Sequence, residues 1–219
     1  MKKFGIMLSV LILSLCISTP GTVFGKAAPQ KKVTLTKEAP ILVDVKGKSV
    51  TMLAEVNGKY LVQSTRHGIV SAAGKFGDKS VFKGYASPKD FYEALVKIGL
   101  KPGNNMTMDN KEKTFVQGSL LDLTVSWDGA RKASYKLDEV IIDSNRKPFK
   151  IRFGGNLETA LKANTGCLLC LDSCPVGITS NEAYTYGAVE KRNEVTFKGN
   201  MKILPPDGSL VVIKVKAKK

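Results

Sequence analysis

Three cysteines lie close together in one short segment, and thiols at this spacing can bind a metal or exchange disulfides. Cys167, Cys170 and Cys174 follow the pattern C-x2-C-x3-C, and a proline comes directly after the last of them. The pattern equals the last three positions of the bacterial ferredoxin run, whose thiolates hold iron–sulfur clusters. Asn164 occupies the place of the first cysteine of that run. Residues 164–178 are therefore expected to form a loop whose three thiols act as one site.

Metal binding is the first chemistry that this segment allows. A [4Fe–4S] cluster normally takes four thiolates, and the fourth cysteine of the chain lies near the N-terminus, far from the other three. The single histidine, His67, could instead join Cys167, Cys170 and Cys174 in a tetrahedral site for zinc or another soft metal. A surface or hydrogen-bonded role is the alternative for His67. Iron–sulfur and zinc are thus both candidate cofactors, and a cluster would indicate electron transfer.

Thiol–disulfide chemistry is the second possibility. Cys167 and Cys170 form a C-x-x-C pair, but no thioredoxin-like strand–helix–strand pattern surrounds them. Disulfides form and persist in the oxidising space outside the cytoplasm, to which this chain is expected to be exported. The alternative function is therefore a disulfide-tied, non-catalytic ligand-binding protein or a thiol-redox protein of the cell envelope. The redox partner of such a protein is not identified by the sequence.

The first 25 residues have the features of a secretory signal peptide. Lys2 and Lys3 precede an apolar run over residues 4–17, and Val23 and Gly25 are the small residues that a signal peptidase needs. The run is short for a transmembrane helix, which needs about 20 residues. We expect cleavage near Gly25 and a secreted or envelope-associated mature protein. An uncleaved segment would instead act as a membrane anchor.

The charge of the chain is strongly basic. Thirty-four Lys and Arg residues against nineteen Asp and Glu residues give a formal net charge of +15. Nucleic-acid binding favours basic residues clustered with interleaved aromatic residues, whereas here they are spread along the chain. We therefore expect no nucleic-acid partner, and consider an anionic surface of the cell envelope a possible one.

The remainder of the chain has the pattern of one β-rich domain. A polar lead over residues 26–32 precedes a single domain over 33–219, with many short apolar runs between turn residues. The dipeptide Asn57-Gly58 predicts a hairpin between strands 50–56 and 60–63. Further strands are expected at 33–36, 41–45, 115–116, 120–127, 135–142, 149–153, 195–204 and 210–215.

One helix is expected near residues 88–98. Ser87 is a suitable N-cap, Pro88 fits the first helical position, and Gly99 fits the residue that ends the helix. Its apolar residues recur at helical spacing and form one face. The predicted fold is therefore mainly β, a sandwich or partly open barrel with this helix packed against it, with an α+β fold as the alternative.

Several segments resemble YdjY-type proteins, and together they cover roughly residues 50–215. They are the helix segment 91–105, the run Phe153-Gly154-Gly155-Asn156, the cysteine segment 164–178, and the pairs Ser180-Asn181 and Gly199-Asn200. The resemblance implies an exported or envelope-associated protein of a type often labelled ferredoxin-like because of its cysteine run.

Motifs of common enzyme classes are absent from the sequence. It contains no nucleophile elbow, no H-E-x-x-H, no Walker loop and no dinucleotide fingerprint. Asp172 and Glu182 lie near the cysteines and could do acid–base chemistry, but we expect them to be solvated surface charges. A catalytic function is accordingly the less favoured interpretation.

Overall fold

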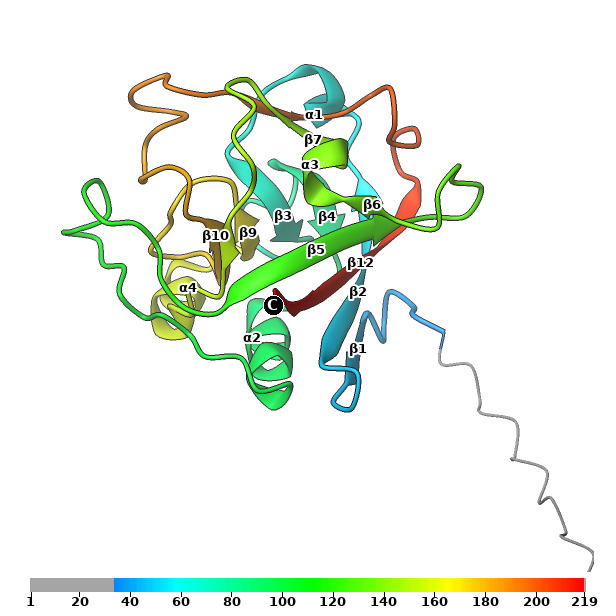
Figure 1. Cartoon of the computed structure of the whole chain (residues 1–219), viewed down its shortest axis with the longest axis horizontal. Helices are drawn as coiled ribbons and strands as arrows, with labels where there is room; N and C mark the ends of the chain where they lie inside the picture. The colour runs from blue at the N-terminus through cyan, green and yellow to red at the C-terminus, as the bar shows by residue number, and fades with distance from the viewer. Residues whose placement is uncertain (1–33, 219) are drawn as a thin grey trace, which may run out of the picture. The chain divides into compact units, whose positions relative to one another are not determined.

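The structure is a computed structural model that describes residues 34–218 (Figure 1). The expected signal peptide over residues 1–25 and the polar lead over 26–32 lie outside the described residues. Among the helices of the described part, none is long and apolar enough to cross a membrane.

A closed β-barrel forms the centre of the described chain. Its strands follow the order β2-β12-β5-β8-β10-β9-β3-β4, and β4 pairs again with β2 to close the ring. In this ring the pairs β3–β4 and β9–β10 are parallel and the others antiparallel. The barrel strands are β2 (Ser49–Val56), β3 (His67–Ser71), β4 (Ser80–Gly84), β5 (Leu120–Ser126), β8 (Ile151–Arg152), β9 (Cys167–Cys170), β10 (Thr179–Asn181) and β12 (Leu210–Ala217).

Four further strands and four short helices complete the fold of residues 34–218. Strand β1 (Ile41–Asp44) pairs with β2, β6 (Tyr135–Lys136) pairs with β5, and β7 (Ile141–Asp143) pairs with β11 (Phe197–Gly199) in a separate small sheet. The helices are α1 (Lys59–Val62), α2 (Pro88–Lys97), α3 (Leu137–Val140) and α4 (Leu157–Ala163). The prediction of a mainly β fold with a barrel is confirmed.

Strand β12 shows how the sequence pattern specifies the barrel. Val211, Ile213 and Val215 have no exposed surface, whereas Lys214 and Lys216 between and after them are exposed. Because successive side chains of a strand point to opposite faces, this alternation places one face in the core and the other in solvent.

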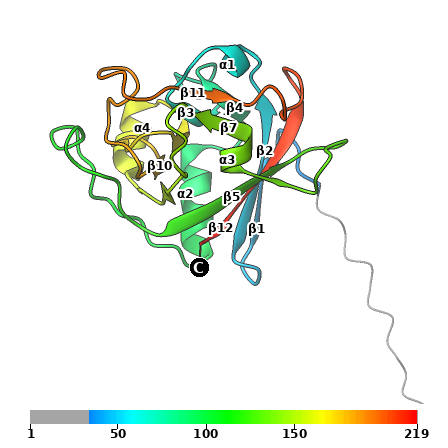
Figure 2. The same cartoon turned by 45° about the horizontal axis from the view of Figure 1, so that its top comes forward.

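Helix α2 agrees with its prediction. Ser87 Oγ accepts a hydrogen bond from the Asp90 amide at 3.0 Å, and Gly99 has a φ of 88°, the left-handed conformation that ends helices. The buried face of α2, which contains Phe91 and Leu95, packs against β1, β2 and β9. Figure 2 shows α2 and α4 side by side.

The predicted hairpin at Asn57-Gly58 is wrong, because residues 59–62 form helix α1 instead of a second strand. Gly58 has φ −56° and ψ −29°, which is helical, whereas a two-residue type I′ turn needs positive φ at both central residues. The Gly58 amide donates to Asp207 Oδ1 at 2.7 Å, a contact distant in sequence that local turn propensity cannot predict. Strand β2 continues as expected, but the chain then leaves the sheet.

Other predicted strands are shorter than expected or absent. The run 135–142 is divided by α3, whose residue Glu139 accepts a hydrogen bond from the Lys136 amide at 2.8 Å and so favours a helical turn. The runs 149–153 and 195–204 contain only the short strands β8 and β11, and residues 34–36 and 115–116 form no strand. Cys167–Cys170 form strand β9, whereas a loop was expected there.

Candidate metal and thiol site

Two neighbouring barrel strands bring His67 and the first two cysteines together. In the antiparallel pair β3–β9, His67 lies opposite Cys170, and Cys167 lies opposite Val70. The register shifts twice between these pairs: Gly68 is the extra residue on β3, and Leu168 is the extra residue on β9. In a regular strand, residues three apart point to opposite faces. These irregularities change the direction of the side chains locally, so that both sulfurs reach the same site.

The side chains of His67, Cys167 and Cys170 form a compact group of potential ligands. Their ligand atoms all lie within 4.8 Å of one another, and His67 Nδ1 is 3.6 Å from Cys167 Sγ. All three residues are buried. His67 and Cys167 are separated by 100 residues in the sequence, so only the strand pairing creates this contact.

Cys174 joins the same buried cluster from the turn after β9. It packs with Cys167, Cys170 and Val70, although its sulfur does not belong to the group within 4.8 Å. Asn156 Nδ2 donates to the Cys174 carbonyl oxygen at 3.2 Å and holds the turn in place. The three cysteines are all free thiols in the structure.

The pKa values of the two strand cysteines are shifted in opposite directions. The pKa of the Cys167 thiol lies well below its ordinary value, mainly because the Cys170 thiol donates to its sulfur, and His67 adds to the effect against burial. The pKa of Cys170 is raised well above its ordinary value, because its thiol donates to Cys167 and Cys174 and is fully buried. Cys167 is therefore the cysteine of this pair that most readily becomes a thiolate.

A cavity of about 620 Å³ lies beside the cluster. Its lining includes His67, Phe76, Met108, Cys167, Cys174 and Tyr186. Cys167 and Cys174 have exposed fractions of 0% and 1%, so access from the cavity to the sulfurs is narrow. Phe76 packs on the imidazole of His67, with 5.6 Å between the ring centroids, and limits the motion of the ring.

A buried ion pair, which the sequence analysis did not predict, lies next to the cysteines. Arg66 Nη2 is 2.6 Å from Asp172 Oδ1, and the Gly187 amide donates to Asp172 Oδ2 at 3.1 Å. Tyr186 lies over the guanidinium, with 4.2 Å between Arg66 Cζ and the ring centroid. The expectation that Asp172 is a solvated surface charge is wrong, because its side chain has no exposed surface.

The charges around this pair keep its guanidinium positively charged beside the sulfurs. Burial acts to lower the pKa of Arg66, but the Asp172 carboxylate raises it above its ordinary value, so the guanidinium stays protonated. Burial also raises the pKa of Asp172, and Arg66 opposes this effect. With a salt bridge of 2.6 Å and a second donor at Gly187, the charged pair is the state that the contacts support.

Two other predicted residues have structural roles. Glu182, expected to be a solvated charge, is half-buried and pairs with Arg152 at 2.5 Å. Asn164, which stands at the place of a first ferredoxin cysteine, ends helix α4 with a φ of 48°. Asparagine tolerates this left-handed conformation better than most residues.

Comparisons with known proteins identify the family of this chain. The profile of the family described as "YdjY domain" matches residues 41–216. The chain belongs to the YdjY family. It is 58% identical over 182 residues to a protein of Escherichia coli (strain K12) described as "Uncharacterized protein YdjY", and the match covers 83% of this chain and 80% of that protein. No solved structure matches the chain.

The YdjY domain match includes every residue of the cysteine–histidine cluster and of the adjoining ion pair. Of the four residues predicted as metal ligands, the structure brings His67, Cys167 and Cys170 together, and Cys174 packs beside them without its sulfur joining the group. Sequence reasoning missed Arg66, although it is the direct neighbour of His67 in the sequence. It also missed Tyr186 and Phe76, for which no spacing or motif gives a signal.

Proposed function

We propose that this YdjY domain binds one soft metal ion through His67, Cys167 and Cys170, with Cys174 as the neighbouring thiol. The observation that carries the proposal is the compact group of three ligand atoms, all within 4.8 Å of one another and all buried. Thiolate and imidazole are the donors that zinc and copper prefer.

The distance between imidazole and thiol fits a single tetrahedral ion. Zinc binds sulfur at about 2.3 Å and nitrogen at about 2.0–2.1 Å, so a tetrahedral angle places the two donors about 3.6 Å apart. His67 Nδ1 and Cys167 Sγ are 3.6 Å apart. Little movement is therefore needed to bring both donors to one ion.

The same compactness favours one ion over an iron–sulfur cluster. A [4Fe–4S] cluster binds each cysteine through a different iron, so its thiolates stand farther apart than ligands of one ion. Here the Cys167 and Cys170 sulfurs lie within 4.8 Å of each other. An iron–sulfur cluster, and with it electron transfer, is the less favoured form of the proposal.

A buried hydroxyl supports a charged state of the sulfurs. Among the described residues, Ser180 Oγ is the buried side-chain nitrogen or oxygen atom that has no hydrogen-bond partner. A Cβ atom built on Gly177 would lie 2.9 Å from Ser180 Oγ and 3.0 Å from Cys170 Sγ, so the hydroxyl and the sulfur both lie close to Gly177. Buried hydroxyls are normally paired, and Cys170 would offer an acceptor nearby once a bound ion displaces the proton of its thiol.

Metal content of the purified full chain tests this function. We expect about one ion per chain after anaerobic purification, measured by mass spectrometry of the elements, and a loss of binding in Cys167→Ser, Cys170→Ser and His67→Gln. Ser87→Ala, which removes the N-cap of α2 away from the site, serves as the control and should retain the ion. Variants that stay folded by circular dichroism and keep wild-type metal content would contradict the proposal.

Thiol–disulfide exchange is the second candidate function. It is favoured by the C-x-x-C pair itself. Cys167 lines the cavity, whereas Cys170 is fully buried and does not line it. Counting the free thiols of denatured protein, purified without reductant from its own compartment, separates the two functions. One free thiol and no metal would support the redox function, whereas three free thiols with bound metal would support the metal site.

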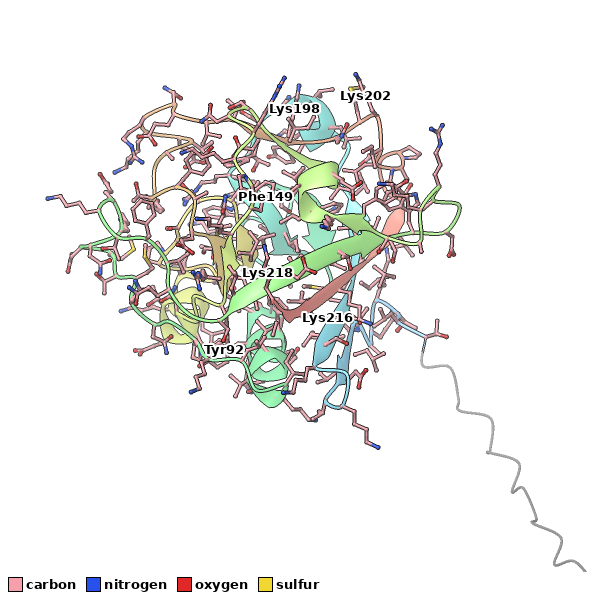
Figure 3. All side chains as sticks on the ribbon, in the orientation of Figure 1. Tyr92, Phe149, Lys198, Lys202, Lys216 and Lys218 are labelled. Atoms are coloured by element: carbon pink, nitrogen blue, oxygen red, sulfur yellow. The ribbon has the colours of Figure 1, made fainter. Side chains whose placement is uncertain are left out.

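Export to the cell envelope is a further part of the proposal. It is supported by the signal-like pattern of residues 1–25 and by the basic exterior, whose exposed lysines extend from Lys198 and Lys202 to Lys216 and Lys218 (Figure 3). Such an exterior suits contact with anionic envelope components. A mature N-terminus near Lys26, found by mass spectrometry of the protein from cells, would support export, and an intact Met1 in the cytoplasmic fraction would argue against it.

A further inference from the structure

We infer that the cavity beside the cysteine cluster binds a small organic carboxylate with an apolar or aromatic body. This ligand site goes beyond metal binding, because its main contact is made by Arg66, which is not a ligand of the proposed ion. The cavity has a volume of about 620 Å³. Pockets that hold small organic molecules have volumes of about 300–1,000 Å³.

Arg66 keeps one guanidinium nitrogen for such a ligand. Its Nε and Nη2 atoms donate to Asp172 Oδ1 at 3.2 and 2.6 Å, and the ring of Tyr186 covers one face of the group. Among residues 34–218, Nη1 forms no hydrogen bond, and Ser180 Oγ is the only fully enclosed side-chain nitrogen or oxygen that lacks a partner. Nη1 is therefore accessible although only 6% of the side chain is exposed, and the cavity is the space that Arg66 lines.

His67 brings a second nitrogen to the same cavity. Its Nδ1 lies 3.6 Å from Cys167 Sγ, and Nε2 forms no hydrogen bond within the described part of the chain. His67 is 6% exposed and lines the cavity. A metal-bound histidine usually donates its other N–H group to a carboxylate, a carbonyl or a water molecule. A contact between the ligand and Nε2 thus rests on the proposed function, whereas the contact with Arg66 does not.

The walls of the cavity favour an apolar body on the ligand. Phe76, Tyr186, Pro175 and Val176 all line it. Burial of apolar surface against such walls provides binding energy, and a small number of polar groups fix the orientation of the ligand. A carboxylate at Arg66 with an aromatic or aliphatic body along these walls satisfies both requirements.

The charges of the cavity favour an anion over a cation. Its lining contains Arg66 and Lys162 against one carboxylate, Glu158. Two further ammonium groups, Lys79 Nζ and Lys111 Nζ, lie 4.7 and 5.0 Å from the centroids of its two aromatic rings. Positive charge therefore surrounds the apolar walls, and a guanidinium binds a carboxylate through charge-assisted hydrogen bonds.

Calorimetric titration of the full chain with 2-naphthoate and its neutral analogue 2-naphthamide tests this inference. We expect 2-naphthoate to bind at one site, at least about tenfold more tightly than 2-naphthamide, because the charged hydrogen bond is the stronger one. Arg66→Lys keeps a cation for Asp172 but loses the free Nη1 donors. It should lower the affinity for 2-naphthoate by at least about tenfold and leave that for 2-naphthamide within about twofold.

A second variant blocks the cavity without touching the buried ion pair. Ala163 is exposed and lines the cavity, so Ala163→Trp should abolish binding of both probes. Ala133→Trp, at an exposed position outside the lining, is the matched control and should bind both probes like the wild type. This pair decides the question even where Arg66→Lys does not fold.

The outcomes separate this inference from the proposed function. A wild type that does not bind 2-naphthoate, or binds both probes equally well, overturns the carboxylate site. Binding by Ala163→Trp at the level of Ala133→Trp overturns its location in the cavity. Metal content is measured on the same samples: a protein that binds 2-naphthoate but holds no ion contradicts the metal site alone, and a protein with the converse behaviour contradicts the carboxylate site alone.

Discussion

Arg66 and Asp172 form a buried salt bridge, with 2.6 Å between Nη2 and Oδ1 and side-chain exposures of 6% and 0%. The two residues are 106 positions apart in the sequence, and they meet next to the cysteine cluster. Because the Leu171 amide donates to the Arg66 carbonyl oxygen at 2.8 Å, the pair also joins the ends of the two strands that carry His67 and Cys170.

Asp172→Asn should destabilise the fold by about 3 kcal/mol, because it leaves the Arg66 guanidinium buried without a counter-charge. Chemical denaturation measures the change in the free energy of unfolding. Glu182→Gln is the matched control, since the Arg152–Glu182 pair is partly exposed and should contribute less than about 1 kcal/mol. Similar losses in the two variants would contradict the structural role of the buried pair.

Gly177→Ala should abolish or strongly weaken metal binding. The new methyl group would lie 3.0 Å from Cys170 Sγ and 2.9 Å from Ser180 Oγ, so one of these buried groups must move. Gly208→Ala is the control: it has a φ of 75° and no atom within 4 Å of the added methyl, and it should cost about 1 kcal/mol of backbone strain. Metal analysis and thermal unfolding of both variants separate a loss of the site from a loss of stability. Retention of wild-type metal content by Gly177→Ala would contradict this prediction.

Tyr184 should make the stability of the domain fall at alkaline pH. Burial and a 2.8 Å hydrogen bond donated to Asp143 Oδ2 raise the pKa of Tyr184 to about 12, above the value of about 10 in an unfolded chain. The stabilisation is therefore complete below pH 10 and is lost as the pH rises through 12, with a size on the order of 2 kcal/mol. Unfolding free energies measured from pH 9 to 12 should decline more steeply in the wild type than in Tyr184→Phe. Parallel curves would refute this assignment.

Removal of the metal should lower the thermal stability of the protein. A ligand that binds only the folded state stabilises it by about 2.7 kcal/mol at a hundredfold excess over its Kd. The midpoint of thermal unfolding should therefore fall when a chelator is added and recover when the ion is restored. Cys167→Ser should show the same midpoint with and without the chelator, because its site is already lost. A wild type that is insensitive to the chelator would speak against the metal site.

The elements that local sequence determines were predicted well. Helix α2 depends on the Ser87 cap, on Pro88 and on Gly99, all within a few residues of the helix. Strand β12 depends on the alternation of apolar and charged residues along its own length. The C-x2-C-x3-C spacing likewise predicted that the three cysteines lie close together, because their separation along the chain is short.

The tertiary structure decided everything that depends on distant contacts. Gly58 bonds to Asp207 and leaves the sheet, so a strong hairpin dipeptide becomes the start of a helix. Asp172 meets Arg66 only because β3 and β9 are neighbours in the barrel, and so a charge expected in solvent becomes buried.

The position of His67 shows the same division within the site itself. Its residue type made it a candidate ligand, but the 3.6 Å contact with Cys167 arises from the pairing of β3 with β9 and its two register shifts. Register shifts in a barrel are set by packing around the whole ring, which no single segment encodes. The sequence alone determined which donors are available, and the closed barrel determined that they meet at one point.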